Sequence, residues 1–291
     1  MTQPVFRFAP SPNGRLHLGH AYSALLNESL ARRFGGRLLL RIENIDVARC
    51  RPEHERALCE DLAWLGLSWE RPVRRQSEHF ETYRAAAAGL AARGLLFPCF
   101  CSRRSIAAAV ARREREAGRP WPRDPDGVPL YPGTCRGLPP AEVERRRAGG
   151  AAHAWRVDMR AAHGAAPGPH GYVRFGPAGP QERVAAHPAR WDGAVVVRAD
   201  IPASYHLAVV VDDALQGVTH VVRGRDLEAA TDLHVMLQAL LGLPAPLYHH
   251  HGLIRDPHGA KLSKSLQSEA LADLRSRGVT AAQVRARLGF P

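Results

Sequence analysis

The sequence predicts an α/β fold in which an inserted subdomain interrupts a parallel sheet. Strand-like and helix-like segments alternate from residue 1 to 96, an order typical of parallel strands joined by right-handed crossovers. From 97 to 190 prolines and glycines are frequent and periodicity is weak, and the alternation then returns. We therefore expect one domain built from 1–96 and 191–255, an insertion at 97–190, and a loop with a short helical C-terminal segment at 256–291.

Glycine and proline punctuate the first half of the expected sheet domain. Gly35 and Gly36 can end a helix, and Pro52 suits the first turn of another. Ser77 can accept a backbone N–H group and so begin a third helix. The predicted elements are strands at Val5–Phe8 and Arg37–Ile42, with helices from about Leu18 to Phe34, from Pro52 to about Leu65, and from Ser77 to about Arg93.

The α/β pattern resumes after the insertion. We expect strands at Leu207–Val211 and Val218–Val222, and an amphipathic helix at Asp226–Leu241. A loop at 255–265 should follow, and one or two short helices should complete the chain. No internal repeat is visible.

The chain is strongly basic, with 40 basic residues against 28 acidic ones and a formal charge of +12. Lysine and arginine release counterions when they bind phosphate, so a nucleic acid is the natural partner to infer, while solubility charge is the alternative. The start of the chain has no apolar leader, and no apolar run approaches the roughly 20 residues needed to span a bilayer. We expect a cytoplasmic protein with reduced cysteines and no membrane partner.

A loop with two histidines joins the first expected strand to the first expected helix. Backbone N–H groups and the helix dipole at such a junction favour a phosphate group. His17 and His20 share a face there, and Gly19 leaves room for a nucleotide beside the backbone. An HxxH pair by itself is more typical of zinc ligands or surface histidines. Its place after a strand and a proline-rich turn favours the phosphates of ATP instead.

The segment KLSKS, at 261–265, is a second candidate for phosphate binding. Lys261 and Lys264 can close on a triphosphate, with charge-assisted hydrogen bonds of about 1.5–3 kcal/mol each. Alone, such a segment is more simply a solvated surface loop. The histidine loop and KLSKS occur in this order, however, and together they resemble the HIGH and KMSKS signatures of class I aminoacyl-tRNA synthetases.

The resemblance narrows to the glutamyl branch of that class. RFAPSPNGRLHLGH resembles RFAPSPTGxLHxGH, and LLLRIENIDVAR resembles LRIEDTDxxR. SYHLAVVVDDALQGVTHVVRGRDL resembles YxLAVVVDDxxxGxTHVxRGxDL. These matches cover most of the chain outside residues 102–190. They imply a Rossmann-like class I catalytic domain that activates glutamate with ATP and Mg²⁺.

The resemblance also assigns roles to residues in these segments. Glu43 would accept the α-ammonium of glutamate, and Arg223 would help to hold a carboxylate, which the bidentate fork of arginine suits. A structural salt bridge is the alternative for both residues. The implied glutamate contacts are Arg7, Phe8, Ala9, Pro10, Ser11, Glu43, Tyr205 and Arg223. The implied catalytic residues are His17, His20, Lys261 and Lys264, and the implied ATP contacts are His17, Gly19, His20 and Lys264.

Two positions depart from the glutamyl pattern. Asn44 stands where Asp usually follows the residue equivalent to Glu43, and His206 stands where Gln often follows Tyr205. Both positions lie beside implied substrate contacts. They are expected to alter details of the pocket and not the chemistry.

Three cysteines of the insertion predict a zinc site. Cys99 and Cys101 form a C-x-C pair, and Cys135 can supply a third thiolate to a tetrahedral zinc ion. Buried free thiols are the alternative. The resemblance implies Tyr131 as the fourth ligand, a set typical of the glutamyl-queuosine group, around one structural Zn²⁺ ion.

Because the sequence ends soon after Ser265, we expect no helical anticodon-reading domain of the kind found in discriminating glutamyl-tRNA synthetases. With the cysteine cluster, this indicates the glutamyl-queuosine tRNA(Asp) synthetase family, whose members attach glutamate to the queuosine base at the wobble position of tRNA(Asp). The implied partners are ATP, L-glutamate and queuosine-containing tRNA(Asp), and we expect a monomer. The alternatives are a minimal synthetase that charges tRNA(Glu) with a separate anticodon-binding partner, an inactive RNA-binding paralogue, and a small-molecule ligase of the same fold.

Overall fold

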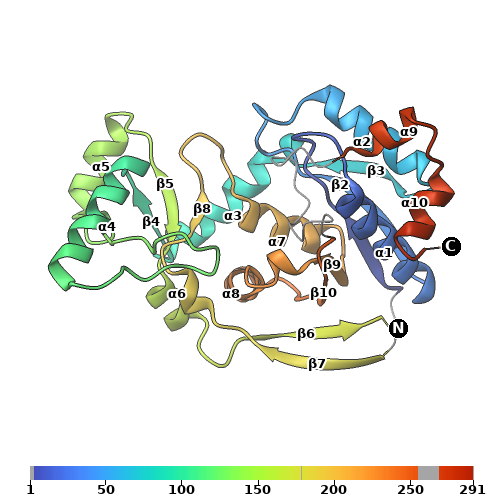
Figure 1. Cartoon of the computed structure of the whole chain (residues 1–291). Coiled ribbons are helices and arrows are strands. Elements are labelled where there is room, and N and C mark those ends of the chain that lie inside the picture. Colours follow the sequence, from blue (N-terminus) through green and yellow to red (C-terminus); the bar gives the residue numbers. More distant parts are fainter. Residues whose placement is uncertain (1–2, 178, 255–268, 291) are drawn as a thin grey trace.

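The fold is that of a computed structural model, which describes residues 3–177, 179–254 and 269–290 (Figure 1). A large sheet with helices packed against it forms one part of the molecule, and a smaller sheet with its own helices forms the other. Within the described residues, no helix is both long and apolar enough to cross a membrane.

The large sheet has seven strands in the order β3-β2-β1-β9-β10-β6-β7. Neighbours from β3 to β6 pair in parallel, whereas β6 and β7 pair antiparallel. From β1 the sheet grows one way through β2 and β3 and the other way through β9 and β10, and ligands of open α/β sheets bind at such a switch point. The strands are β1 (Val5–Phe8), β2 (Arg37–Ile42), β3 (Glu70–Arg75), β6 (Gly171–Gly176), β7 (Gly179–Ala185), β9 (His220–Gly224) and β10 (Leu247–His251).

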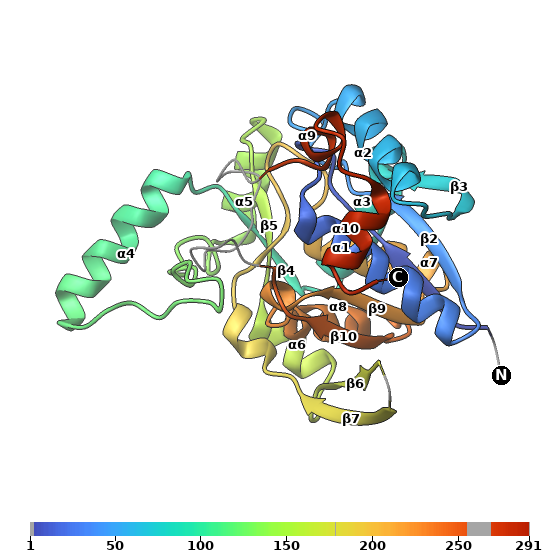
Figure 2. The same ribbon diagram turned by 45° about the vertical axis from the view of Figure 1, so that its right-hand side comes forward.

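Two main apolar clusters hold helices around this sheet. One joins α1 and α2 to β2, and Leu271, Leu274 and Val284 of the C-terminal helices α9 and α10 complete it (Figure 2). The other lies among α3, α7 and α8. The helices are α1 (Leu18–Arg33), α2 (Pro52–Trp64), α3 (Phe80–Ala92), α7 (Tyr205–Leu215), α8 (Thr231–Leu241), α9 (Leu271–Ser276) and α10 (Ala281–Arg287).

The smaller sheet has the order β4-β5-β8 and is antiparallel. One face of β4 and β5 continues the α3–α7–α8 cluster through Leu96 and Val157, while Phe97 and Cys99 pack with the cysteine cluster on the other face. Helix α4 projects away from the rest of the molecule (Figure 2). The elements are β4 (Leu96–Cys99), α4 (Arg103–Ala117), α5 (Pro140–Ala148), β5 (Ala154–Val157), α6 (Met159–Ala165) and β8 (Val195–Val197).

The strand predicted at Leu207–Val211 is wrong, because these residues belong to helix α7. Ser204 caps that helix, its Oγ accepting the N–H of Leu207 at 3.4 Å. Five successive residues from 207 to 211 are buried, since α7 lies inside the core. A short apolar run buried all round has no period that separates strand from helix.

Other predicted boundaries shift. Ser77 lies in a single 3₁₀ turn, Gln76–Glu78, and does not cap α3, which begins at Phe80. The helix expected from Asp226 begins at Thr231, after a 3₁₀ turn at Arg225–Leu227. The division at 97–190 stays a prediction, although β6 and β7 join the large sheet and β8 joins the smaller one.

Candidate active site and metal centre

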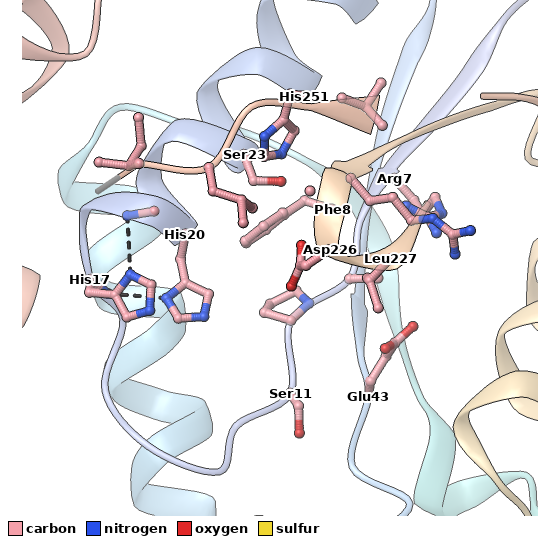
Figure 3. Close-up of a pocket in the computed structure, with 18 of the residues that line it drawn as sticks. Arg7, Phe8, Ser11, His17, His20, Ser23, Glu43, Asp226, Leu227 and His251 are labelled. Carbon is pink, nitrogen blue, oxygen red and sulfur yellow. Dashed lines mark hydrogen bonds between the residues drawn. The ribbon is translucent and has the colours of Figure 1, made fainter. Parts of the chain in front are cut away.

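A cavity of about 540 Å³ opens at the carboxyl ends of β1, β2 and β9, which is the switch point of the sheet (Figure 3). Its lining brings together the histidine loop, the end of β2 and the end of β9. Lys261 and Lys264 lie outside the described residues. The predicted residues that line the cavity are Arg7, Phe8, Ala9, Pro10, Ser11, His17, Gly19, His20, Glu43, Tyr205 and Arg223.

His17 and His20 are held at the first turn of α1 by the backbone. The Nδ1 of His17 accepts the N–H of Gly19 at 3.1 Å, and the Nδ1 of His20 accepts the N–H of His17 at 3.2 Å (Figure 3). Because each Nδ1 is an acceptor, a neutral ring carries its proton on Nε2. A side chain at Gly19 would approach the His17 ring to 3.0 Å, so glycine keeps this arrangement open. The loop therefore presents two Nε2–H donors on one helix turn.

A buried chain of charges lies behind the cavity. Arg7 donates to Asp213 at 3.1 Å, and Arg41, which is fully buried, donates to Asp213 at 2.6 Å and to Glu43 at 3.0 Å. Burial raises the pKa of Glu43 against the opposing effect of Arg41 and Arg7. Burial also opposes ionisation of Asp213, but Arg7 and Arg41 hold the pKa of that carboxyl below its ordinary value. These contacts fix Glu43 at the cavity wall.

Arg41 and Asp213 were missed as site residues by the sequence analysis. The available signals were an arginine within the apolar strand segment LLLRI and the adjacent aspartates, Asp212 and Asp213, within a largely apolar run. Charged residues are rarely buried unless they are paired, so their presence in these segments indicates an internal ion pair.

Arg223 differs from these arginines because its protein partners are neutral. It donates to Thr231 Oγ1 at 2.7 Å and Tyr205 Oη at 3.3 Å, and it lies 3.4 Å from His250 Nε2 and 3.2 Å from His234 Nδ1. Burial, with Arg223 next, lowers the pKa of His250 to about 2 and that of His234 well below its ordinary value, so both rings are neutral. No carboxylate of the described residues lies within ion-pair distance of this guanidinium. A buried cation without a counter-charge is costly, so the site is built for an anion.

The two departures from the glutamyl pattern have different surroundings. Asn44 Oδ1 accepts the N–H of Ser77 at 2.9 Å and does not line the cavity. His206 Nδ1 lies 3.2 Å from His234 Nε2, and burial with Arg223 lowers its pKa to about 4. His206 is therefore a neutral ring, and His234 lies between it and Arg223.

The predicted metal ligands lie together beside the smaller sheet, in the apolar cluster that includes Phe97 of β4. The sulfurs of Cys99, Cys101 and Cys135 all lie within 4.8 Å of one another. Tyr131 Oη lies 3.4 Å from Cys101 Sγ and accepts the N–H of Cys135 at 2.9 Å. Three thiols and a phenol oxygen facing one point fit a tetrahedral zinc ion. Gly193 lies directly behind Tyr131, where a Cβ would come within 2.5 Å of the Tyr131 Cβ.

Comparisons with known proteins agree with this geometry. Residues 4–279 match the family model for the catalytic domain of class I tRNA synthetases (E and Q). A glutamyl-Q tRNA(Asp) synthetase of Rhodobacter capsulatus is 46% identical, over 98% of this chain and 100% of its own length. A glutamyl-Q tRNA(Asp) synthetase of Symbiobacterium thermophilum is 42% identical, over 98% of this chain and 85% of its own length.

A solved glutamate tRNA ligase of Elizabethkingia meningosepticum, in complex with its amino acid, has a TM-score of 0.72 at 27% identity. The match covers 91% of this chain and 53% of that one, so the chain spans about half the length of that ligase. The sheet, the cavity at its switch point and these matches lead to one conclusion: the chain belongs to the class I tRNA synthetases of the E and Q family and is a ligase of that family.

Proposed function

We propose that this protein activates L-glutamate with ATP and transfers it to the queuosine base of tRNA(Asp). The observation that carries the amino-acid choice is Arg223, a buried guanidinium whose described partners are all neutral. A carboxylate is the natural ligand of such a group. Glu43, at the same cavity, supplies the anion that an α-ammonium needs.

In the first step the α-carboxylate of glutamate attacks the α-phosphate of ATP, and pyrophosphate leaves. Catalysis of this displacement is positioning and charge stabilisation, with no protein nucleophile. His17 and His20 would donate from Nε2 to the phosphates, to which Mg²⁺ is bound as part of the substrate. Lys261 and Lys264 are proposed to add positive charge at the same phosphates.

In the second step a hydroxyl of the queuosine cyclopentenediol attacks the glutamyl carbonyl, and AMP leaves. We propose this acceptor because relatives that match nearly the whole chain are named glutamyl-Q tRNA(Asp) synthetase. Zinc held by Cys99, Cys101, Tyr131 and Cys135 would stabilise the smaller sheet and would take no part in the transfer.

Amino-acid-dependent exchange of pyrophosphate into ATP tests the activation step. With and without added RNA, glutamate should support exchange, and glutamine should support it at least a hundredfold less well. Glutamine carries no charge for Arg223, and its amide donors would face the donors of that side chain. Equal exchange with both amino acids would refute the assignment of Arg223.

A further inference from the structure

A second cavity, of about 750 Å³, lies between α4 and the segments that follow β7. Helix α4 lines it with Ile106, Val110 and Ala111, which share one face of the helix. The opposite wall contains Trp191 and Tyr205. This cavity is open to solvent, so it is an accessible groove and not an interior void. A concave, mostly apolar space of this size with a few polar groups in its lining is typical of a ligand site.

The second cavity adjoins the glutamate cavity. Tyr205 lines both, and its hydroxyl accepts from Arg223 at 3.3 Å. The carboxylates of Asp126 and Asp226 also interact across the two cavities. Burial raises the pKa of Asp126, and the negative charges of Asp124 and Asp226 raise it further. Asp126 lines the second cavity and Asp226 the first. A ligand in the second cavity would therefore lie next to glutamate, across Tyr205.

We propose that this second cavity binds the acceptor nucleobase of the RNA. The inference rests on the proposed function and names the place where its second substrate enters. A base needs apolar walls for its faces and polar groups for its edges, and it is read in RNA after it has left the stack. Ile106, Val110 and Trp191 supply the walls, while Arg103 and Arg156 supply donors.

The lining carries both signs of charge, and its charged residues are Arg103, Arg156, Arg198, Glu114, Asp124, Asp126 and Asp192. Of these, Asp126 can receive the side chain of queuosine, which has a secondary amine that is protonated near neutral pH. Asp126 lines the cavity, and among the described residues no cation pairs with it. The exposed side of α4 carries Arg112 and Arg115, which suit the phosphates of a loop. The cavity thus complements a cationic base, and the exposed side of α4 complements the anionic RNA backbone.

This placement gives the transfer step a route. The base hydroxyl oxygen forms an ester bond to the glutamyl carbonyl carbon, and the bond from that carbon to the AMP oxygen breaks. AMP leaves with the electron pair, and the hydroxyl proton leaves to the released phosphate or to water. Tyr205, at the common wall, is a positioning residue between the two substrates.

Two tryptophan substitutions on α4 test the proposal. Ala111→Trp fills the cavity, whereas Ala108→Trp, three residues earlier, places the same side chain on an exposed position outside the lining. Glutamate-dependent pyrophosphate exchange and transfer of labelled glutamate to queuosine-containing tRNA(Asp) are measured for both variants and the unaltered protein. We expect A111W to keep exchange within twofold and to lose transfer more than tenfold, with A108W unchanged in both assays.

Three results would overturn the proposal. Transfer by A111W at the unaltered rate would mean that the base does not enter this cavity. Equal losses of transfer in A111W and A108W would indicate an effect of the helix surface. Loss of exchange in A111W alone would indicate that α4 supports the glutamate site. Absence of transfer by the unaltered protein, with exchange present, would instead refute the proposed acceptor, so the two failures are distinguishable.

Discussion

Arg223→Met removes a buried positive charge and keeps a side chain of similar length. If the guanidinium binds a carboxylate of glutamate through two charge-assisted hydrogen bonds, its loss costs about 3–6 kcal/mol of binding at about 1.5–3 kcal/mol each. One tenfold change corresponds to about 1.4 kcal/mol, so kcat/KM for glutamate in the exchange assay should fall about 10²- to 10⁴-fold. The KM for ATP should change little, because the histidine loop is untouched.

The same substitution should not destabilise the fold. Arg223 is 5% exposed and its described partners are neutral, so the apolar replacement relieves an uncompensated buried charge, which offsets the loss of its hydrogen bonds to Thr231 and Tyr205. We expect the Tm of R223M to equal or exceed that of the unaltered protein. Arg174→Met is the matched control, because Arg174 pairs with Glu228 and Glu182 and lines neither cavity. Exchange by R223M within threefold of the R174M value, or a Tm that falls with the activity, would refute the reasoning.

Three further predictions concern the metal centre and the histidines. Purified protein should contain one zinc per chain, and Cys135→Ser or chelation should lower both zinc content and Tm; a metal-free protein of unchanged Tm would contradict the site. Gly193→Ala should lower Tm and zinc content, because Gly193 has φ +76° and touches Tyr131, whereas Gly164→Ala, with open space around it, should do neither; equal effects would disprove the contact. His206 alone should lower the free energy of unfolding by up to about 1.4 kcal/mol per pH unit between about pH 6.5 and pH 4, because the unfolded chain protonates it there while the folded protein keeps it neutral, and the buried rings of His234 and His250 add to this slope. His206→Gln should make the slope shallower by that share in urea unfolding at pH 7 and 5, and an unchanged slope would exclude a contribution from His206.

The sequence predicted the strands nearest the cavity well because their signals are local. Val5–Phe8 and Arg37–Ile42 were predicted with their observed bounds, each being a short apolar run beside glycine or proline. Helix α7 was mistaken for a strand because its burial depends on neighbours that are distant in sequence. The pairing of β6 and β7 with β10 likewise depends on contacts that no local pattern encodes.

The candidate site could be predicted where a motif places several residues on one turn or at one strand end. His17, His20 and Glu43 line the same cavity, as the motifs indicate, although their roles stay predictions. The neutral surroundings of Arg223 could not be read from the sequence. They depend on His250 and Thr231, which two other elements bring to the end of β9.

The most direct measurement is the location of transferred glutamate in the RNA. Labelled glutamate, ATP and Mg²⁺ are incubated with queuosine-containing tRNA(Asp), with tRNA(Asp) that lacks queuosine, and with tRNA(Glu). Each RNA is then digested to nucleosides, and the labelled product is identified by mass spectrometry. We expect label only on the queuosine nucleoside of the first RNA. Label on the terminal adenosine of tRNA(Glu), or label on none of the three, would contradict this expectation.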